Sequence, residues 1–119
     1  MNKVNFADKF SMFNGLWEPK IVGELNNQYV KLAKLKGEFV WHDHENEDEL
    51  FMVIKGHLTI KLRNGDVELD EGEMYIIPRG VEHMPVAENE VHVLMFEPKG
   101  TVNTGNVESD RTVKDIEVI

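Results

Sequence analysis

The sequence has no cysteine, which excludes disulfide bonds, thiolate metal ligands and a cysteine nucleophile together. It also has few basic residues: 13 Lys and Arg stand against 22 Asp and Glu, a formal net charge of −9. Nucleic acids and anionic membranes both attract Lys and Arg, so this balance argues against either as a partner. We therefore expect no nucleic-acid partner and no membrane partner.

Long apolar runs are also missing. None approaches the ~20 residues that cross a bilayer, and the stretch from Met1 to Phe6 lacks the apolar region of a signal peptide. A cytoplasmic location is the expectation. The 119 residues suit one domain, 1–119, because a chain of this length builds one core and not two.

Short alternating runs dominate the chain from residue 20 onward. The runs predicted as strands are 20–25, 28–36, 39–44, 49–54, 58–62, 67–69, 74–77, 83–86 and 91–96. Asn26-Asn27 and Asn64-Gly65 predict tight hairpin turns, and the last two strands are expected to pair around 88–90. Closely spaced strands with turn residues between them are typical of a sandwich or barrel. The predicted barrel core is about 28–98.

Both ends of the chain differ from this core. Phe6, Phe10 and Phe13 recur at helical spacing and predict a short amphipathic helix that packs on the sheet or on a second subunit. The helix and the first strand make up 4–25. The tail, 99–119, is expected to run as an extended arm along the barrel or its partner, or to be partly disordered.

The candidate metal-binding residues are mainly histidines. His42 and His44 are two residues apart, so both imidazoles project from one face of an extended strand. Glu49 begins the next apolar run after an acidic turn, and His83 follows another strand-like run. Three imidazoles and a carboxylate that converge in a small sheet protein bind a divalent transition metal: Zn, Fe, Mn, Ni or Cu.

Other residues compete for these roles. The acids of the turn, Glu45, Glu47 and Asp48, are alternatives to Glu49, although they read more simply as solvated loop charges. The remaining histidines, His57 and His92, read as ordinary sheet residues. Around the site, Phe51, Val53 and Met95 are candidates for an apolar wall. Arg79 is a candidate anion contact, against a plain surface role, and Tyr75 a candidate hydrogen-bond donor, against core packing.

The spacing of these residues resembles the two sequence motifs of the cupin family. His42, His44, Glu49 and Gly56 follow the first motif, and Gly72, Pro78, Gly80 and His83 follow the second. Two positions depart from the pattern. Four residues instead of five separate Gly37 from His42, and Ala87 stands where an asparagine often closes the second motif. The similarity is nearest to small single-domain cupins, some of which carry a mannose-6-phosphate-isomerase-like label.

The resemblance implies an all-β double-stranded β-helix, or jelly-roll barrel, with a short N-terminal helix. It places His42, His44, Glu49 and His83 around a metal at the barrel mouth, and two further coordination positions would be left for water, substrate or dioxygen. We expect a metal-binding protein that acts on or binds a small polar organic molecule. Either it is an oxygenase, isomerase or lyase, or it is a non-catalytic binding or sensing module. Open sheet edges and the aromatic N-terminal segment further predict a homodimer.

Overall fold

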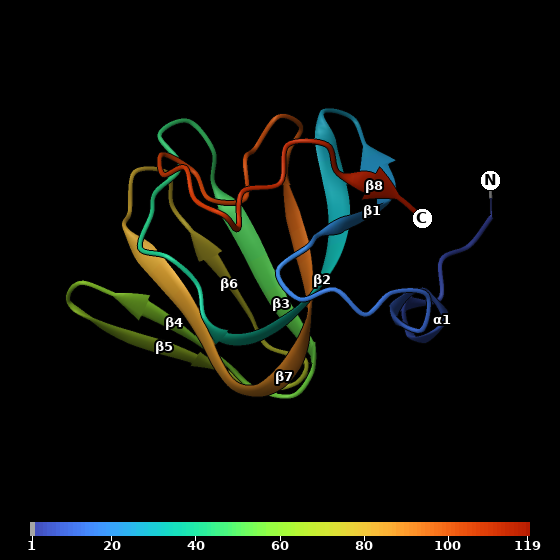
Figure 1. Ribbon diagram of the computed structural model, residues 1–119, viewed down its shortest axis with the longest axis horizontal. Helices are drawn as coiled ribbons and strands as arrows, with labels where there is room; N and C mark the ends of the chain where they lie inside the picture. The colour runs from blue at the N-terminus through green and yellow to red at the C-terminus, as the bar shows by residue number, and fades with distance from the viewer. Residues whose placement is uncertain (1) are drawn as a thin grey trace.

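The computed structural model describes residues 2–119. Within them lie one α-helix and eight strands (Figure 1). Their bounds are α1 Phe6–Phe10, β1 Lys20–Leu25, β2 Gln28–Glu38, β3 Glu49–Lys55, β4 Leu58–Leu62, β5 Gly65–Leu69, β6 Met74–Ile77, β7 His83–Pro98 and β8 Glu117–Val118. The predicted all-β class with a short N-terminal helix is confirmed, although the helix ends at Phe10 and not at Phe13.

The strand β7 organises the sheet. It pairs with β2 along almost its whole length, with β4 through its first residues and with β3 through its last ones. The complete order is β5-β4-β7-β2-β1-β8, and β3 joins β6 to β7. Figure 1 shows β7 curving around one end of the molecule, so that the same strand serves both sides of the barrel.

The prediction of two final strands was wrong, because 83–98 is one strand. Glu88, Asn89 and Glu90 are exposed as expected of a turn, yet they keep extended backbone where the strand bends between the two sides of the barrel. The pairing with β2 is irregular at this bend, because residues 88–90 of β7 stand opposite Lys36 alone. Extra residues of this kind let a strand bend without ending.

The predicted strand 39–44 was also wrong. These residues form a loop that contacts β7 through an isolated bridge between His42 and His83 and through the Phe39 N–H, which donates to the Pro85 carbonyl. The remaining predicted strands are confirmed. Both hairpins are present, with loops at Asn26-Asn27 and, one residue earlier than expected, at Arg63-Asn64. Asn26 has φ 53°, which asparagine tolerates better than most residues.

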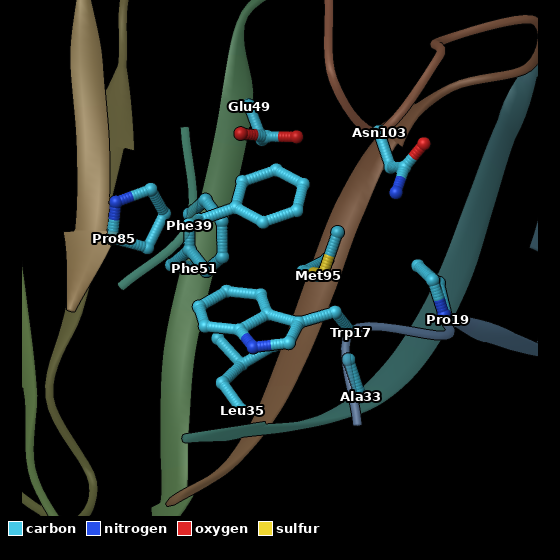
Figure 2. Close-up of a pocket in the computed structure, with 10 residues that line it drawn as sticks. All are labelled: Trp17, Pro19, Ala33, Leu35, Phe39, Glu49, Phe51, Pro85, Met95 and Asn103. Carbon is cyan, nitrogen blue, oxygen red and sulfur yellow. The ribbon is translucent and has the colours of Figure 1, made fainter. Parts of the chain in front are cut away.

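The core fills the inside of the barrel. Its buried members are Trp17, Ala33, Leu35, Phe51, Val53, Leu58, Ile60, Leu69, Ile77, Ala87, Val91, Val93 and Met95. Figure 2 shows Trp17, Leu35 and Phe51 within this interior, below the carboxylate of Glu49. A fully buried aliphatic side chain stabilises the fold by about 1.5–3 kcal/mol relative to exposure. The alternation along β3 and β7 therefore determines which face of each strand turns inward.

The helix α1 covers part of the outer sheet face, where Phe10 and Phe13 pack with Val22 and Leu32. The tail does not run as an extended arm: it makes successive turns from residue 99 to 116 and becomes a strand only at β8, parallel to β1. No helix within residues 2–119 is long and apolar enough to cross a membrane.

Candidate metal centre

The isolated bridge brings His42 and His83 face to face. The His42 N–H donates to the His83 carbonyl at 3.0 Å, and the His83 N–H donates to the His42 carbonyl at 2.9 Å. Residues that exchange both hydrogen bonds in an antiparallel pair place their side chains on the same face. Accordingly, the two imidazole centroids lie 4.2 Å apart.

His44 and Glu49 complete the cluster from the same side. The Gly80 N–H donates to the carbonyl of His44 at 2.8 Å, which ties the loop to the turn before His83. Glu49 is the first residue of β3, in the inward phase that it shares with Phe51 and Val53. The structure therefore brings together all four residues that the sequence singled out as metal ligands.

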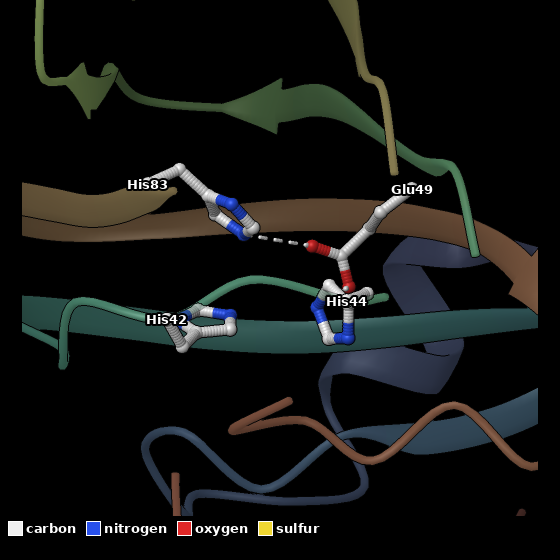
Figure 3. A group of neighbouring side chains, drawn as sticks. All are labelled: His42, His44, Glu49 and His83. Atoms are coloured by element: carbon white, nitrogen blue, oxygen red, sulfur yellow. Dashed lines mark ion pairs between the residues drawn. The ribbon is translucent and has the colours of Figure 1, made fainter. Parts of the chain in front are cut away.

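The four side chains point toward one another (Figure 3), and one potential ligand atom from each lies within 4.8 Å of the others. Glu49 stands between two imidazoles: its Oε2 is 3.4 Å from His44 Nε2, and its Oε1 is 3.4 Å from His83 Nε2. All four residues are buried, with no more than 4% of any of them exposed. The result is a compact, enclosed set of three imidazoles and one carboxylate.

Backbone carbonyls orient two of the imidazoles. His42 Nδ1 donates to the Val40 carbonyl at 2.8 Å, and His83 Nδ1 donates to the Val81 carbonyl at 2.9 Å. A carbonyl only accepts, so the proton of each neutral ring sits on Nδ1 and Nε2 keeps its lone pair. This arrangement, in which the far ring nitrogen is held by an acceptor, is the usual support for a metal-binding histidine.

The charges within the cluster suit a cation. Burial and the neighbouring His83 disfavour an imidazolium at His42 and lower its pKa to about 4. Burial would also lower the pKa of His44, but contact with the Glu49 carboxylate outweighs it and raises that pKa. Burial opposes ionisation of Glu49 too, yet contacts with Glu97, His44 and His83 hold its pKa well below the usual range. The centre thus combines an ionised carboxylate with an uncharged imidazole at His42.

Buried polar atoms without hydrogen-bond partners indicate whether the cluster fits a metal ion. Besides Glu97 Oε2, three atoms of the cluster itself are buried without a hydrogen-bond partner among the residues described: His44 Nε2, His83 Nε2 and Glu49 Oε1. The two imidazole nitrogens are each 3.4 Å from a Glu49 oxygen, His44 Nε2 from Oε2 and His83 Nε2 from Oε1, which exceeds the roughly 2.7–3.2 Å of a normal hydrogen bond. Buried polar atoms without partners are rare because each costs about 1–3 kcal/mol. These atoms face one another, so a single cation would satisfy all three, and the site fits a metal.

A second buried carboxylate lies beside the first. Glu97 is 1% exposed and contacts Glu49, while Lys31 Nζ donates to Glu97 Oε1 at 2.8 Å. Burial and the charge of Glu49 raise the pKa of Glu97 well above its usual range, against the opposing effect of Lys31. The pKa values of the two carboxyl groups thus shift in opposite directions, and contact with Glu97 contributes to the low pKa of Glu49.

The sequence analysis did not single out Glu97 or Lys31, although the alternation of inward and outward residues along their strands places both side chains inward. Glu97 continues the inward phase of Val93 and Met95 along β7. Lys31 lies opposite Met95 on β2, again among inward residues. A charged side chain at an inward strand position is a signal of a buried ion pair.

The competing acids are not part of the cluster. Glu45 and Asp48 are exposed, and Glu47 is partly exposed and accepts a bond from the Asn46 N–H. His57 binds Glu68 and Asp70 on the surface, and His92 stacks on Phe10.

The expected wall and contact residues are only partly at the site. Phe51 and Met95 line a cavity beside Glu49, whereas Val53 is core without lining it. Tyr75 packs against the core. Arg79 lines a groove on the outer surface with Ile76.

The tail closes the mouth of the barrel. The Asn106 N–H donates to the Asp43 carbonyl at 3.1 Å, and the Asp43 N–H donates to Asn106 Oδ1 at 2.9 Å. A Cβ on Gly105 would lie 2.0 Å from the Asp43 carbonyl oxygen, so only glycine allows this approach. Figure 1 shows the segment between β7 and β8 crossing this end of the barrel. The tail is thus part of the site's enclosure.

Comparisons with known proteins identify the family and the fold. A cupin domain family model matches residues 28–97. The chain is similar to a cupin-2 domain containing protein of Shewanella frigidimarina, with 48% identity and a TM-score of 0.80 over 81% of this chain and 94% of that one. It is also similar to protein NMB1881 of Neisseria meningitidis, with 25% identity and a TM-score of 0.76 over 82% of this chain and all of the other. The uncharacterized YdbB protein of Bacillus subtilis is 36% identical over 63 residues, 52% of this chain and 56% of that protein.

Proposed function

This chain belongs to the cupin family, and we propose that it holds one divalent transition metal ion and binds a small organic molecule beside it. The residues proposed to hold the ion are His42, His44, Glu49 and His83. Imidazole nitrogens suit Zn, Fe, Ni and Cu, and a carboxylate extends the choice to Mn. When bound, such an ion supplies a Lewis acid that polarises an oxygen of the organic ligand.

The observation that carries this proposal is the set of buried atoms without partners. His44 Nε2, His83 Nε2 and Glu49 Oε1 converge inside the described fold with no hydrogen-bond partner. The protein's own groups support them: the carbonyls of Val40 and Val81 fix two ring orientations, and contact with Glu97 helps to hold the pKa of Glu49 below its usual range. Each of these features stabilises a cation-binding state of the cluster.

Elemental analysis of protein purified without added metal tests the proposal. We expect about one transition metal ion per chain, in agreement with one cluster of four ligands. Dialysis against a chelator should remove the ion and lower the thermal midpoint, because a ligand that binds only the folded state stabilises it. A stoichiometry near zero, unchanged after reconstitution with each candidate metal, would contradict it.

We also propose that the protein is a homodimer, with the outer face of the β6-β3-β7-β2 sheet as the interface. The register places apolar side chains in two rows across these strands, formed by Ile76, Leu50, Phe96 and Val30, and by Met74, Met52, Leu94 and Leu32. The helix α1 covers the β2 end of the rows, where Val30, Leu32 and Leu94 pack with Phe10. At the β6 end, Met74 and Ile76 are 54% and 47% exposed.

A second copy is a suitable occupant of this face. Contiguous exposed apolar residues often mark an interaction site. The two rows contain no charged residue although the chain carries a net charge of −9. Two copies can therefore meet here by the same patch, as a two-fold interface requires, without bringing like charges together.

Light scattering at micromolar concentration should give twice the chain mass of 13.7 kDa. We expect Ile76→Lys to shift the protein to monomer, because it would bury a charge within the apolar interface. Val118→Lys serves as the control, since Val118 is 71% exposed on β8 and outside the two rows. A monomeric wild-type protein would refute the dimer, and an unchanged mass for Ile76→Lys would refute this interface.

A further inference from the structure

The metal cluster is closed to solvent in this structure. No more than 4% of any of its four residues is exposed. The cavity beside Glu49 has a volume of about 30 Å³, which is room for about one water molecule. An organic molecule therefore cannot reach the proposed metal ion in this conformation, and a covering element has to move to admit it.

Residues 101–113 of the tail, which we call the flap, cover the cluster. Asn103 and Thr104 are 7% and 0% exposed, and Asn103 also lines the small cavity. A Cβ on Gly105 would lie 3.1 Å from His42 Cδ2, so the flap packs directly against an imidazole of the cluster. Figure 1 shows the segment between β7 and β8 crossing this end of the barrel. The flap is therefore the element whose movement would uncover the site.

Hydrogen bonds within the flap hold it together as one unit. Asn103 Nδ2 donates to the Arg111 carbonyl at 2.8 Å, and Asn103 Oδ1 accepts from the Val113 N–H at 2.9 Å. The hydroxyls of Thr104 and Thr112 bond to each other at 2.7 Å. These bonds join residues eight to ten positions apart, so the two halves of the flap are tied to each other. A compact loop that is packed by its own side chains can move without unfolding.

Few hydrogen bonds join the flap to the barrel. Among the residues described, those that reach the loop at the barrel mouth are the two between Asn106 and Asp43. The others run from the N–H and the hydroxyl of Thr101 to the Pro98 carbonyl, at the point where the flap leaves β7. A swing of the flap about its base therefore breaks two hydrogen bonds and keeps those inside it.

The chain at the base of the flap has room to move. A groove of about 290 Å³ is lined on one side by residues 100–102 and 113–116 and on the other by β1 and β2. Gly100, between β7 and the flap, has φ 88°, a conformation that glycine adopts readily. Hinges are usually a few residues at the end of an element. The closed position is also held by Arg111, whose guanidinium lies over the Trp17 ring, 5.3 Å from the centroid.

We infer that the flap is a hinged lid, which swings away from Asp43 as one unit and so admits the metal ion and the organic ligand. The inference rests on the proposed metal centre for what passes the lid, while the contacts of the flap alone determine how it moves. A lid of this kind gives access to an enclosed site and then excludes water from it.

Rates of metal transfer test the lid. Asn106→Ala removes the side chain that accepts from the Asp43 N–H, and it leaves all four proposed ligands in place. Loss of one hydrogen bond should raise the population of the open state about threefold to tenfold. We expect Zn²⁺ release to an excess of chromogenic chelator, and Zn²⁺ uptake by the metal-free protein, to accelerate by the same factor. The equilibrium affinity for Zn²⁺ should stay unchanged, since a lid alters both rates alike.

Asn64→Ala is the matched control, because Asn64 is an exposed asparagine in the hairpin between β4 and β5, outside the flap. It should leave both rates at the wild-type value. Rates for Asn106→Ala that equal those of Asn64→Ala would overturn the lid. Faster release with a matching loss of affinity would overturn it too, because that result indicates damage to the ligands.

Amide hydrogen exchange of the metal-free wild-type protein, followed by NMR, tests the lid without a variant. A flap that swings as a unit frees the N–H groups of Asp43 and Asn106 and keeps the bonds of the Val107 and Val113 N–H groups. We expect the first two to exchange at least about tenfold faster than the last two, after correction for intrinsic rates. Equal protection of all four amides would overturn the lid.

The exchange measurement needs no metal ion and no substitution. It therefore remains decisive if Asn106→Ala fails to fold or if elemental analysis finds no metal in the wild-type protein. A failed metal centre and a failed lid thus give different results.

Discussion

His44→Ala should remove the metal and leave the fold intact. Loss of a group that only supports a ligand weakens metal binding about 10–100-fold, so loss of a direct ligand should weaken it by more than about 100-fold. His44 Nε2 is one of the buried atoms that lack a partner, so the substitution breaks no hydrogen bond of the side chain. The bond from the Gly80 N–H to the His44 backbone carbonyl is retained in the variant. We expect metal content below about one tenth of the wild-type value, measured by elemental analysis after gel filtration.

His57→Ala is the matched control, because His57 is about half exposed and binds Glu68 and Asp70 away from the cluster. It should retain full metal content. Urea unfolding of metal-free His44→Ala should stay cooperative, which separates the loss of a ligand from a loss of structure. Equal metal content in His44→Ala and wild type would eliminate the proposed ligand assignment.

Lys31→Met should produce the largest loss of stability. Lys31 and Glu97 form an ion pair at 2.8 Å with side chains 1% and 0% exposed. Removal of one partner leaves the other in the interior without its counter-charge and its hydrogen bond, and disruption of a buried pair costs about 3–5 kcal/mol. The free energy of unfolding of the metal-free protein, measured by urea denaturation, should fall by this amount. A fall of this size is a large share of the stability of a typical small domain.

Two further variants test the physical reason. Lys99→Met breaks an exposed pair with Glu24, in which the two side chains are 36% and 59% exposed, so it should cost far less stability than Lys31→Met. The double variant Lys31→Met/Glu97→Leu should recover most of the loss, because well-packed apolar residues often replace a buried pair without net cost. If Lys31→Met destabilises no more than Lys99→Met, the buried pair is not a source of stability.

Local patterns explain why much of this molecule could be read from its sequence. Alternation of apolar and polar residues is a local property, and it identified β3 to β6 because each of these strands has one inward and one more open face. The residue types of His42, His44, Glu49 and His83, with their spacing, also indicated which side chains to examine. The approach failed at 88–90, where three exposed polar residues mark a bend within one strand and resemble a turn in sequence.

The sequence by itself determined the donor chemistry, the absence of thiolates and the strand pattern, because these depend on residue identity and on near neighbours along the chain. Only the tertiary structure decided that His42 and His83 meet, since their bridge joins a loop to a strand 41 residues away. It likewise decided that Lys31 reaches Glu97 and that the tail closes the barrel mouth. These contacts link distant segments, and their geometry comes from the packing of the whole barrel, which no local pattern encodes.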